Sequence, residues 1–82
     1  MRTELVREEL VFLVRNAPFR PFIINMENAD RILVQHPENI AFDPVGSGRT
    51  DFYVLSAGMR FFGTFNAVSG LTRLDNGTTS NT

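Results

Sequence analysis

Two prolines, Pro18 and Pro21, separate a part of the chain with helical periodicity from a longer part with the periodicity of strands. Each proline has a fixed φ and no backbone N–H, and each biases the residue before it toward extended geometry. A helix that begins near the N-terminus is therefore not expected to continue through this segment. The stretch APFRPFIINM, residues 17–26, is predicted to join a helix to the first strand of a sheet.

Residues 3–15 predict the helix. Thr3 suits the N-cap, and Glu4 lies in the first turn, where the helix dipole favours a negative charge. Asn16 is a suitable helix end ahead of the proline. Within the apolar side of this helix, Val6, Leu10 and Leu13 stand at helical spacing. The whole apolar side consists of Leu5, Val6, Leu10, Phe12, Leu13 and Val14.

From Phe22 onward the apolar residues follow the two-residue period that is typical of strands. FIINM and RILVQH are predicted to pair across the polar turn ENAD, in which Asn28 tolerates a positive φ best. Pro37 predicts a kink or strand end, after which IAF can resume extended structure. DFYVLS and RFFGTF are two further predicted strands around an AGM turn, and Gly63 indicates a close backbone approach or a bend. AVSGLTRL fits a helical turn followed by a short strand.

These elements predict a mainly β member of the α+β class. An N-terminal helix is followed by four or five antiparallel strands, which form a curved sheet or a small SH3/Sm-like barrel. A single domain covers residues 1–75, with the helix at 3–15 and the β region at 20–74, and the polar tail 76–82 is predicted to be disordered. Because a short chain builds a small core, self-association would add stability.

The composition excludes several classes of protein. There is no cysteine, so disulfides and thiolate metal sites are excluded. The net charge is −1, which lacks the basic excess that is usual in nucleic-acid binders, although all eight cations are arginine. No apolar window reaches the roughly 18 residues of a membrane span, and the N-terminal segment MRTELVREELVF is too charged for a signal peptide. We therefore expect a cytoplasmic protein with no membrane partner.

His36, Pro37 and Glu38 form the one segment in which an imidazole and a carboxylate lie close in sequence. A general base with an orienting carboxylate, or half of a metal site, is the functional interpretation. A single histidine without cysteine or a recognisable nucleophile favours a structural one, in which the imidazole bonds to the backbone at a strand kink and Glu38 caps the turn. We expect no catalytic residue, no metal and no cofactor. GSGR, residues 46–49, is interpreted as a hairpin loop rather than a phosphate-binding nest.

The chain contains eight phenylalanines and no tryptophan. Exposed aromatic rings on a sheet can stack on bases in single-stranded nucleic acids. Without a basic groove, however, the phenylalanines are expected in the core, with some of them at a subunit interface. Phe19 and Phe22 are three residues apart across the proline segment and are expected to pack on different neighbours.

The segment from Ala17 to about Thr50 resembles a family of small bacterial proteins of uncharacterised activity, common in planctomycetes and similar GC-rich bacteria. The resemblance rests on Pro18-Phe19-Arg20-Pro21-Phe22, on V-Q-H-P-E with its His36-Pro37-Glu38, and on G-R-T. Where that family usually has an Asp-Gly hairpin, this chain has Asn-Ala at positions 28 and 29. The resemblance implies the fold and no particular activity. The order of elements is also similar to the Sm and Hfq-like small barrels, by architecture alone.

Two functions follow as hypotheses. The first is a non-enzymatic, self-associating interaction or regulatory module, a homo-oligomer that can also bind another protein. The second is an Sm/Hfq-like RNA-binding protein, which would require its arginines to converge on one surface. The candidate interaction residues are Arg20, Arg31, Arg49 and Arg60.

Overall fold

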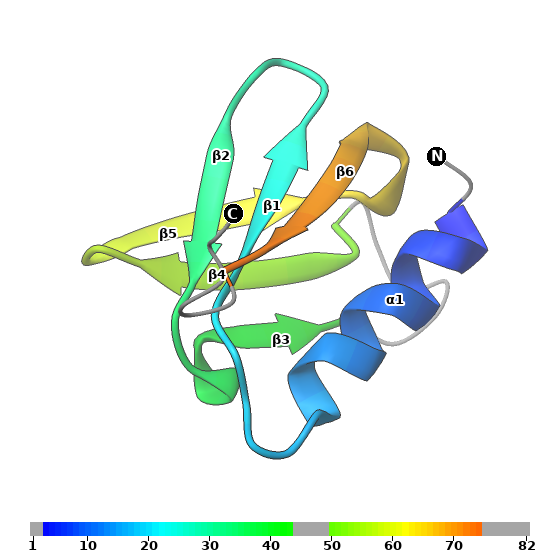
Figure 1. Cartoon of the computed structure of the whole chain (residues 1–82). Helices are drawn as coiled ribbons and strands as arrows, with labels where there is room; N and C mark the ends of the chain where they lie inside the picture. The colour runs from blue at the N-terminus through cyan, green and yellow to red at the C-terminus, as the bar shows by residue number, and fades with distance from the viewer. Residues whose placement is uncertain (1–2, 44–49, 75–82) are drawn as a thin grey trace.

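The computed structural model describes residues 3–43 and 50–74 of the chain. One helix is followed by six strands in two three-stranded antiparallel sheets, ordered β2-β1-β6 and β3-β4-β5. Figure 1 shows the β2–β1–β6 sheet lying across the β3–β4–β5 sheet, with α1 beside both. The elements are α1 (Thr3–Arg15), β1 (Phe22–Met26), β2 (Arg31–Val34), β3 (Ile40–Phe42), β4 (Phe52–Ser56), β5 (Met59–Gly63) and β6 (Val68–Arg73), with short 3₁₀ helices η1 (Pro37–Asn39) and η2 (Phe65–Ala67).

The helix has the bounds that its sequence predicts. Val6, Leu10 and Leu13 are spaced by one turn and are buried, and they join side chains of both sheets in one core cluster. Leu5 and Phe12 also belong to the apolar set but lie on the far side of the helix, where Phe12 is 61% exposed. One helix face therefore closes the core, as amphipathic spacing requires.

The chain passes from one sheet to the other at η1. Pro37 occupies the first turn of this 3₁₀ helix, where a missing N–H costs no ladder hydrogen bond. The kink predicted at Pro37 is confirmed, but β2 already ends at Val34, two residues before the end of the predicted strand. Because β3 is a separate strand, the described part of the β region holds six strands rather than four or five.

The β1–β2 turn and the β4–β5 turn each contain an alanine with positive φ. In the β1–β2 turn the positive φ of 76° belongs to Ala29, so the assignment of that role to Asn28 was wrong. The Asn28 side chain instead bonds Asp30, its Oδ1 accepting from the backbone N–H and its Nδ2 donating to a carboxylate oxygen. Between β4 and β5 the turn is Ala57–Gly58, with φ values of 53° and 77°, one residue shorter than predicted because Met59 is already in the strand. Two successive positive φ values are typical of a type I′ hairpin.

Three aromatic rings pack together on the inner side of the β3–β4–β5 sheet. Phe52 and Phe65 stack with ring centroids 5.7 Å apart, and Phe42 lies 6.4 Å from Phe65. Gly63 allows this packing, because a Cβ built on it would lie 2.5 Å from the Phe52 ring. The close approach predicted at this glycine is confirmed.

The mainly β α+β class is therefore confirmed. The predicted helical turn and strand in AVSGLTRL are η2 and β6. The GSGR loop and the tail at 76–82 lie outside the described residues. In the part of the chain that the structure describes, no helix has the length and apolar character needed to cross a bilayer.

Candidate functional site

The outward face of the β3–β4–β5 sheet is apolar. Ala41, Tyr53 and Phe62 lie opposite one another on the three strands and form one row, and Leu55 on β4 begins a second row. Because side chains alternate along a strand, these residues point away from the core. Phe62 is 65% exposed and Leu55 is 50% exposed. We call Ala41, Tyr53, Leu55 and Phe62 the outer patch.

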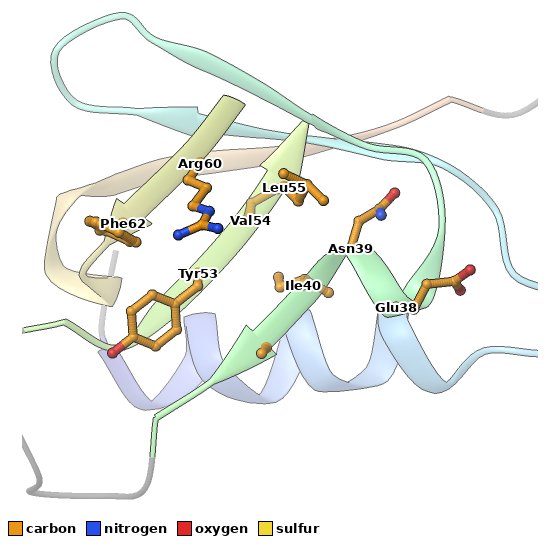
Figure 2. Close-up of a pocket in the computed structure, with 9 residues that line it drawn as sticks. Glu38, Asn39, Ile40, Tyr53, Val54, Leu55, Arg60 and Phe62 are labelled. Atoms are coloured by element: carbon orange, nitrogen blue, oxygen red, sulfur yellow. The ribbon is translucent and has the colours of Figure 1, made fainter. Parts of the chain in front are cut away.

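A shallow depression of about 220 Å³ lies on the outer patch. Its polar rim consists of Arg60, which lies opposite Leu55 on β5, and of Glu38 and Asn39, which precede β3. Figure 2 shows Arg60 on the β5 side of the depression and Glu38 on the β3 side. The patch therefore has a cationic flank and an anionic flank, with apolar side chains between them.

Tyr53 is held in place at one end of the patch. Its hydroxyl donates a 2.7 Å hydrogen bond to Oδ2 of Asp43, and its ring meets Phe62 edge-on, with centroids 5.3 Å apart. That hydrogen bond raises the pKa of Tyr53 above its ordinary value, and burial and the negative charge of Asp43 act in the same direction. A raised pKa keeps the phenol protonated, which is the opposite of an activated base or nucleophile. Tyr53 therefore offers a rigid, amphipathic contact surface.

Two carboxylates near the patch have structural partners. Asp43 accepts the bond from Tyr53, and Oδ2 of Asp51 accepts a 2.8 Å bond from the N–H of Phe65 at the start of η2. The backbone N–H of Asp43 also donates to the carbonyl of Asp51 at 2.9 Å. Among the described residues, no group of three or more His, Asp and Glu side chains is placed to bind a metal ion.

The His36-Pro37-Glu38 segment forms the start of η1. Both His36 and Glu38 are exposed, and no side-chain bond from His36 caps the turn. The carbonyl of His36 instead accepts a 3.0 Å bond from the N–H of Asn39. The expected imidazole–backbone bond at the kink was therefore wrong, because the backbone closes the turn without it. Glu38 flanks the outer patch.

The predicted interaction arginines lie on separate parts of the molecule. Arg60 flanks the outer patch, whereas Arg20 lines a separate cavity with Phe19, Pro21 and Leu74. Arg31 lies at the opposite end of the β1–β2 hairpin from Arg20, since at least three residues of strand, about 10 Å, lie between them. Arg49 falls outside the described residues.

The proline segment is a joint between helix and sheet, as predicted. Its Ala17–Pro18 peptide bond is cis, and Phe22 opens β1. The two aromatic rings of the segment do not separate, however. Phe19 and Phe22 pack together with centroids 6.1 Å apart, so the expectation of different neighbours was wrong. Phe22 belongs to the buried core cluster, and Phe19 packs against the same cluster, so the two rings share one apolar environment.

Sequence reasoning placed the phenylalanines in the core or at an interface without naming the outer patch. Phe22, Phe52 and Phe65 are indeed buried, whereas Phe12 and Phe62 are exposed. A signal was present in the predicted strands DFYVLS and RFFGTF, because both have apolar residues on both faces. A strand with one face in water is expected to alternate with polar residues instead.

Comparisons with protein-family models, with curated proteins and with solved structures find no match for this chain. The resemblance of residues 17–50 to the bacterial family therefore stays a prediction, and the site must be interpreted from its own geometry.

Proposed function

We propose that this protein is a non-enzymatic interaction module that associates with copies of itself through the outer patch. One observation carries the proposal: Tyr53, Leu55 and Phe62 lie on neighbouring strands of one sheet and line the same apolar depression. Contiguous exposed apolar surface of this kind is typical of protein contact sites. Aromatic side chains on a fixed scaffold also lose little conformational freedom on binding.

The polar surroundings support contact rather than chemistry. The Tyr53 hydroxyl is occupied by Asp43, and its raised pKa disfavours the ionised form. The remaining rim groups, Arg60, Glu38 and Asn39, suit the polar border of an interface. For a chain of 82 residues, burying such a surface against another copy would also enlarge a small core.

The experiment is a measurement of molar mass against protein concentration by sedimentation velocity. The wild-type mass should rise with concentration, and Phe62→Ser should shift the protein toward the monomer. Phe12→Ser is the matched control, since Phe12 is 61% exposed and Phe62 is 65% exposed, but Phe12 lies on α1 away from the patch. A wild-type protein that stays monomeric at all concentrations would contradict the proposal, as would equal effects of the two substitutions.

RNA binding is the second candidate, and one observation favours it. The exposed ring of Phe62 lies beside Tyr53 with Arg60 on the same strand, and aromatic rings next to a guanidinium can stack on unpaired bases. The separation of Arg20 from Arg31 argues against a continuous basic surface. A fluorescently labelled single-stranded oligonucleotide at low salt tests it: binding that Arg60→Gln and Phe62→Ser both abolish would favour RNA over self-association.

A further inference from the structure

The outer patch is asymmetric across its three strands, in size and in charge. On the β5 side it carries the large ring of Phe62 and the cation Arg60. On the β3 side it carries the small side chain of Ala41, preceded by Asn39 and the anion Glu38. The pairing register places Ala41 in the row of Phe62. The register begins at Ile40, which pairs with Val54, so extending it by one residue brings Asn39 to the level of Leu55 and Arg60, and these three residues line the same depression.

Arg60 and Glu38 do not meet within one copy. Arg60 lies on β5 and Glu38 lies in η1, directly before β3. Because β4 runs between β3 and β5, the two flanks are separated by two inter-strand spacings of about 4.8 Å each. Within the described part of the chain, the side chains of Arg60 and Glu38 form no hydrogen bond or ion pair. Each flank can therefore receive an opposite charge from outside.

In an interface with two-fold symmetry, every contact between residue i of one copy and residue j of the other is repeated between residue j of the first copy and residue i of the second. An axis that lies between two facing sheets and runs parallel to β4 exchanges the β3 side with the β5 side. It brings Phe62 of one copy over Ala41 of the other, a large side chain onto a small one. It also brings Arg60 over Asn39 and within one residue of Glu38.

The alternative axis, perpendicular to the strands, keeps β5 opposite β5 and β3 opposite β3. Arg60 then faces the β5 strand of the other copy, which carries no carboxylate, and Glu38 faces the β3 side. Of these two axes, the one parallel to β4 makes both charge and size complementary.

We propose that two copies pack outer patch against outer patch about a two-fold axis parallel to β4, so that Arg60 of each copy pairs with Glu38 of the other. This inference rests on the proposed function and specifies its partner as a second copy in one defined register. Tyr53 and Leu55 meet their own counterparts near the axis, and the two ion pairs form at the border. The result is a closed dimer rather than a chain of copies.

Charge reversal tests the register. Arg60→Glu alone, or Glu38→Arg alone, places two like-charge pairs in each dimer, because the symmetry repeats every contact. Either change should weaken self-association by about tenfold or more, and the effect should shrink as salt is added. The double variant Arg60→Glu/Glu38→Arg restores opposite charges and should recover the wild-type dissociation constant.

Mixing the two single variants gives the most specific result. Each variant self-associates weakly, but in a mixed dimer both contacts between position 60 of one copy and position 38 of the other join opposite charges. One variant is labelled with a fluorophore and followed by sedimentation velocity, and the mixture should associate with near wild-type affinity. Both positions are exposed, so the variants should unfold at the wild-type temperature, which a thermal melt checks.

A size change provides a second test. Ala41→Trp fills the space that Phe62 of the other copy is expected to occupy, and it should weaken the dimer without destabilising the monomer. Gln35→Trp, also at an exposed position and outside the patch, is the control.

The outcomes separate the register from the proposed function. If the wild type associates and Phe62→Ser weakens it, but reversal and mixing have no effect, the two-fold register is overturned and self-association stands. If the wild type does not associate at any concentration, the proposed function fails together with the register. Rescue in the double variant and in the mixture supports both.

Discussion

The two faces of the β3–β4–β5 sheet both carry apolar side chains, but they differ in how far those side chains are exposed to solvent. The inner face carries Ile40, Phe52 and Val54, which are 7%, 0% and 2% exposed. The outer face carries Leu55 and Phe62, which are 50% and 65% exposed. Both faces are apolar, but α1 and the β2–β1–β6 sheet cover only the inner one (Figure 1). The comparison teaches that apolar alternation identifies a strand, and that the rest of the fold decides which face is left for a partner.

The largest expected difference between the faces is in stability. Phe52→Ala removes a fully buried ring and should cost about 3–5 kcal/mol, a large share of the roughly 4–12 kcal/mol expected for a chain of this length. Phe62→Ala removes an exposed ring and should cost about 1 kcal/mol or less, chiefly from its contact with Tyr53. Urea denaturation at low protein concentration measures both. Similar losses for the two variants would break the distinction between a core face and a contact face.

Two glycine-to-alanine substitutions test the packing of the inner face, with a smaller expected change in the free energy of unfolding. Gly63→Ala places a methyl group 2.5 Å from the buried Phe52 ring and should destabilise the protein by about 1–3 kcal/mol through overpacking. Gly70 on β6 has no atom within 4 Å of a built Cβ, so Gly70→Ala should be neutral or slightly stabilising. Free energies of unfolding from the same denaturation series test the pair. A neutral Gly63→Ala would mean that the inner face is loosely packed.

The smallest effect concerns the titration of Tyr53 on the outer face. Because the chain has one tyrosine and no tryptophan, an absorbance titration reports this group alone. The midpoint should lie above the ordinary 10.0, and Asp43→Ala should lower it by removing the acceptor, whereas Asp30→Ala should not. A midpoint at the ordinary value in the wild type would show that the ring is not held as described.

The same pKa shift gives the sign of a pH effect on stability. The folded-state pKa of Tyr53 is above its unfolded-state value, so the folded protein binds the phenolic proton more tightly. The stability that protonated Tyr53 contributes to the folded state is fully present below pH 10. It decreases as the pH rises from about 10 through the raised folded-state pKa. The wild type should therefore lose its advantage over Asp43→Ala in that range.

Much of the fold could be predicted because its signals are local. The helix bounds follow from the predicted Thr3 N-cap, from apolar residues spaced by one helical turn and from the proline that follows the helix, and all of these signals lie within residues 3–18. Pro37 and Gly63 were informative because their effects are also local: proline fixes φ and lacks an N–H, and glycine lacks the Cβ that would meet the Phe52 ring. Local signals were less informative at the turns. Asn28 tolerates a positive φ, yet the hydrogen bonds of its side chain to Asp30 leave the positive φ to Ala29.

The candidate site was predicted only in part, because it is a property of pairing between strands. Arg60 and Glu38 were both named from the sequence, the first as an interaction residue and the second beside His36. Their relation across the depression depends on the order β3-β4-β5, and no spacing along the chain encodes that order. The same applies to the separation of Arg20 from Arg31.

The amino-acid sequence by itself determined the helix, the approximate positions of most strands and the points at which the backbone bends, since periodicity, proline and glycine act over a few residues. It also determined that both faces of the β3–β4–β5 sheet would be apolar. Only the tertiary structure decided which face α1 and the second sheet would cover. That choice depends on how segments far apart in the chain share one small core, which cannot cover both faces of the sheet.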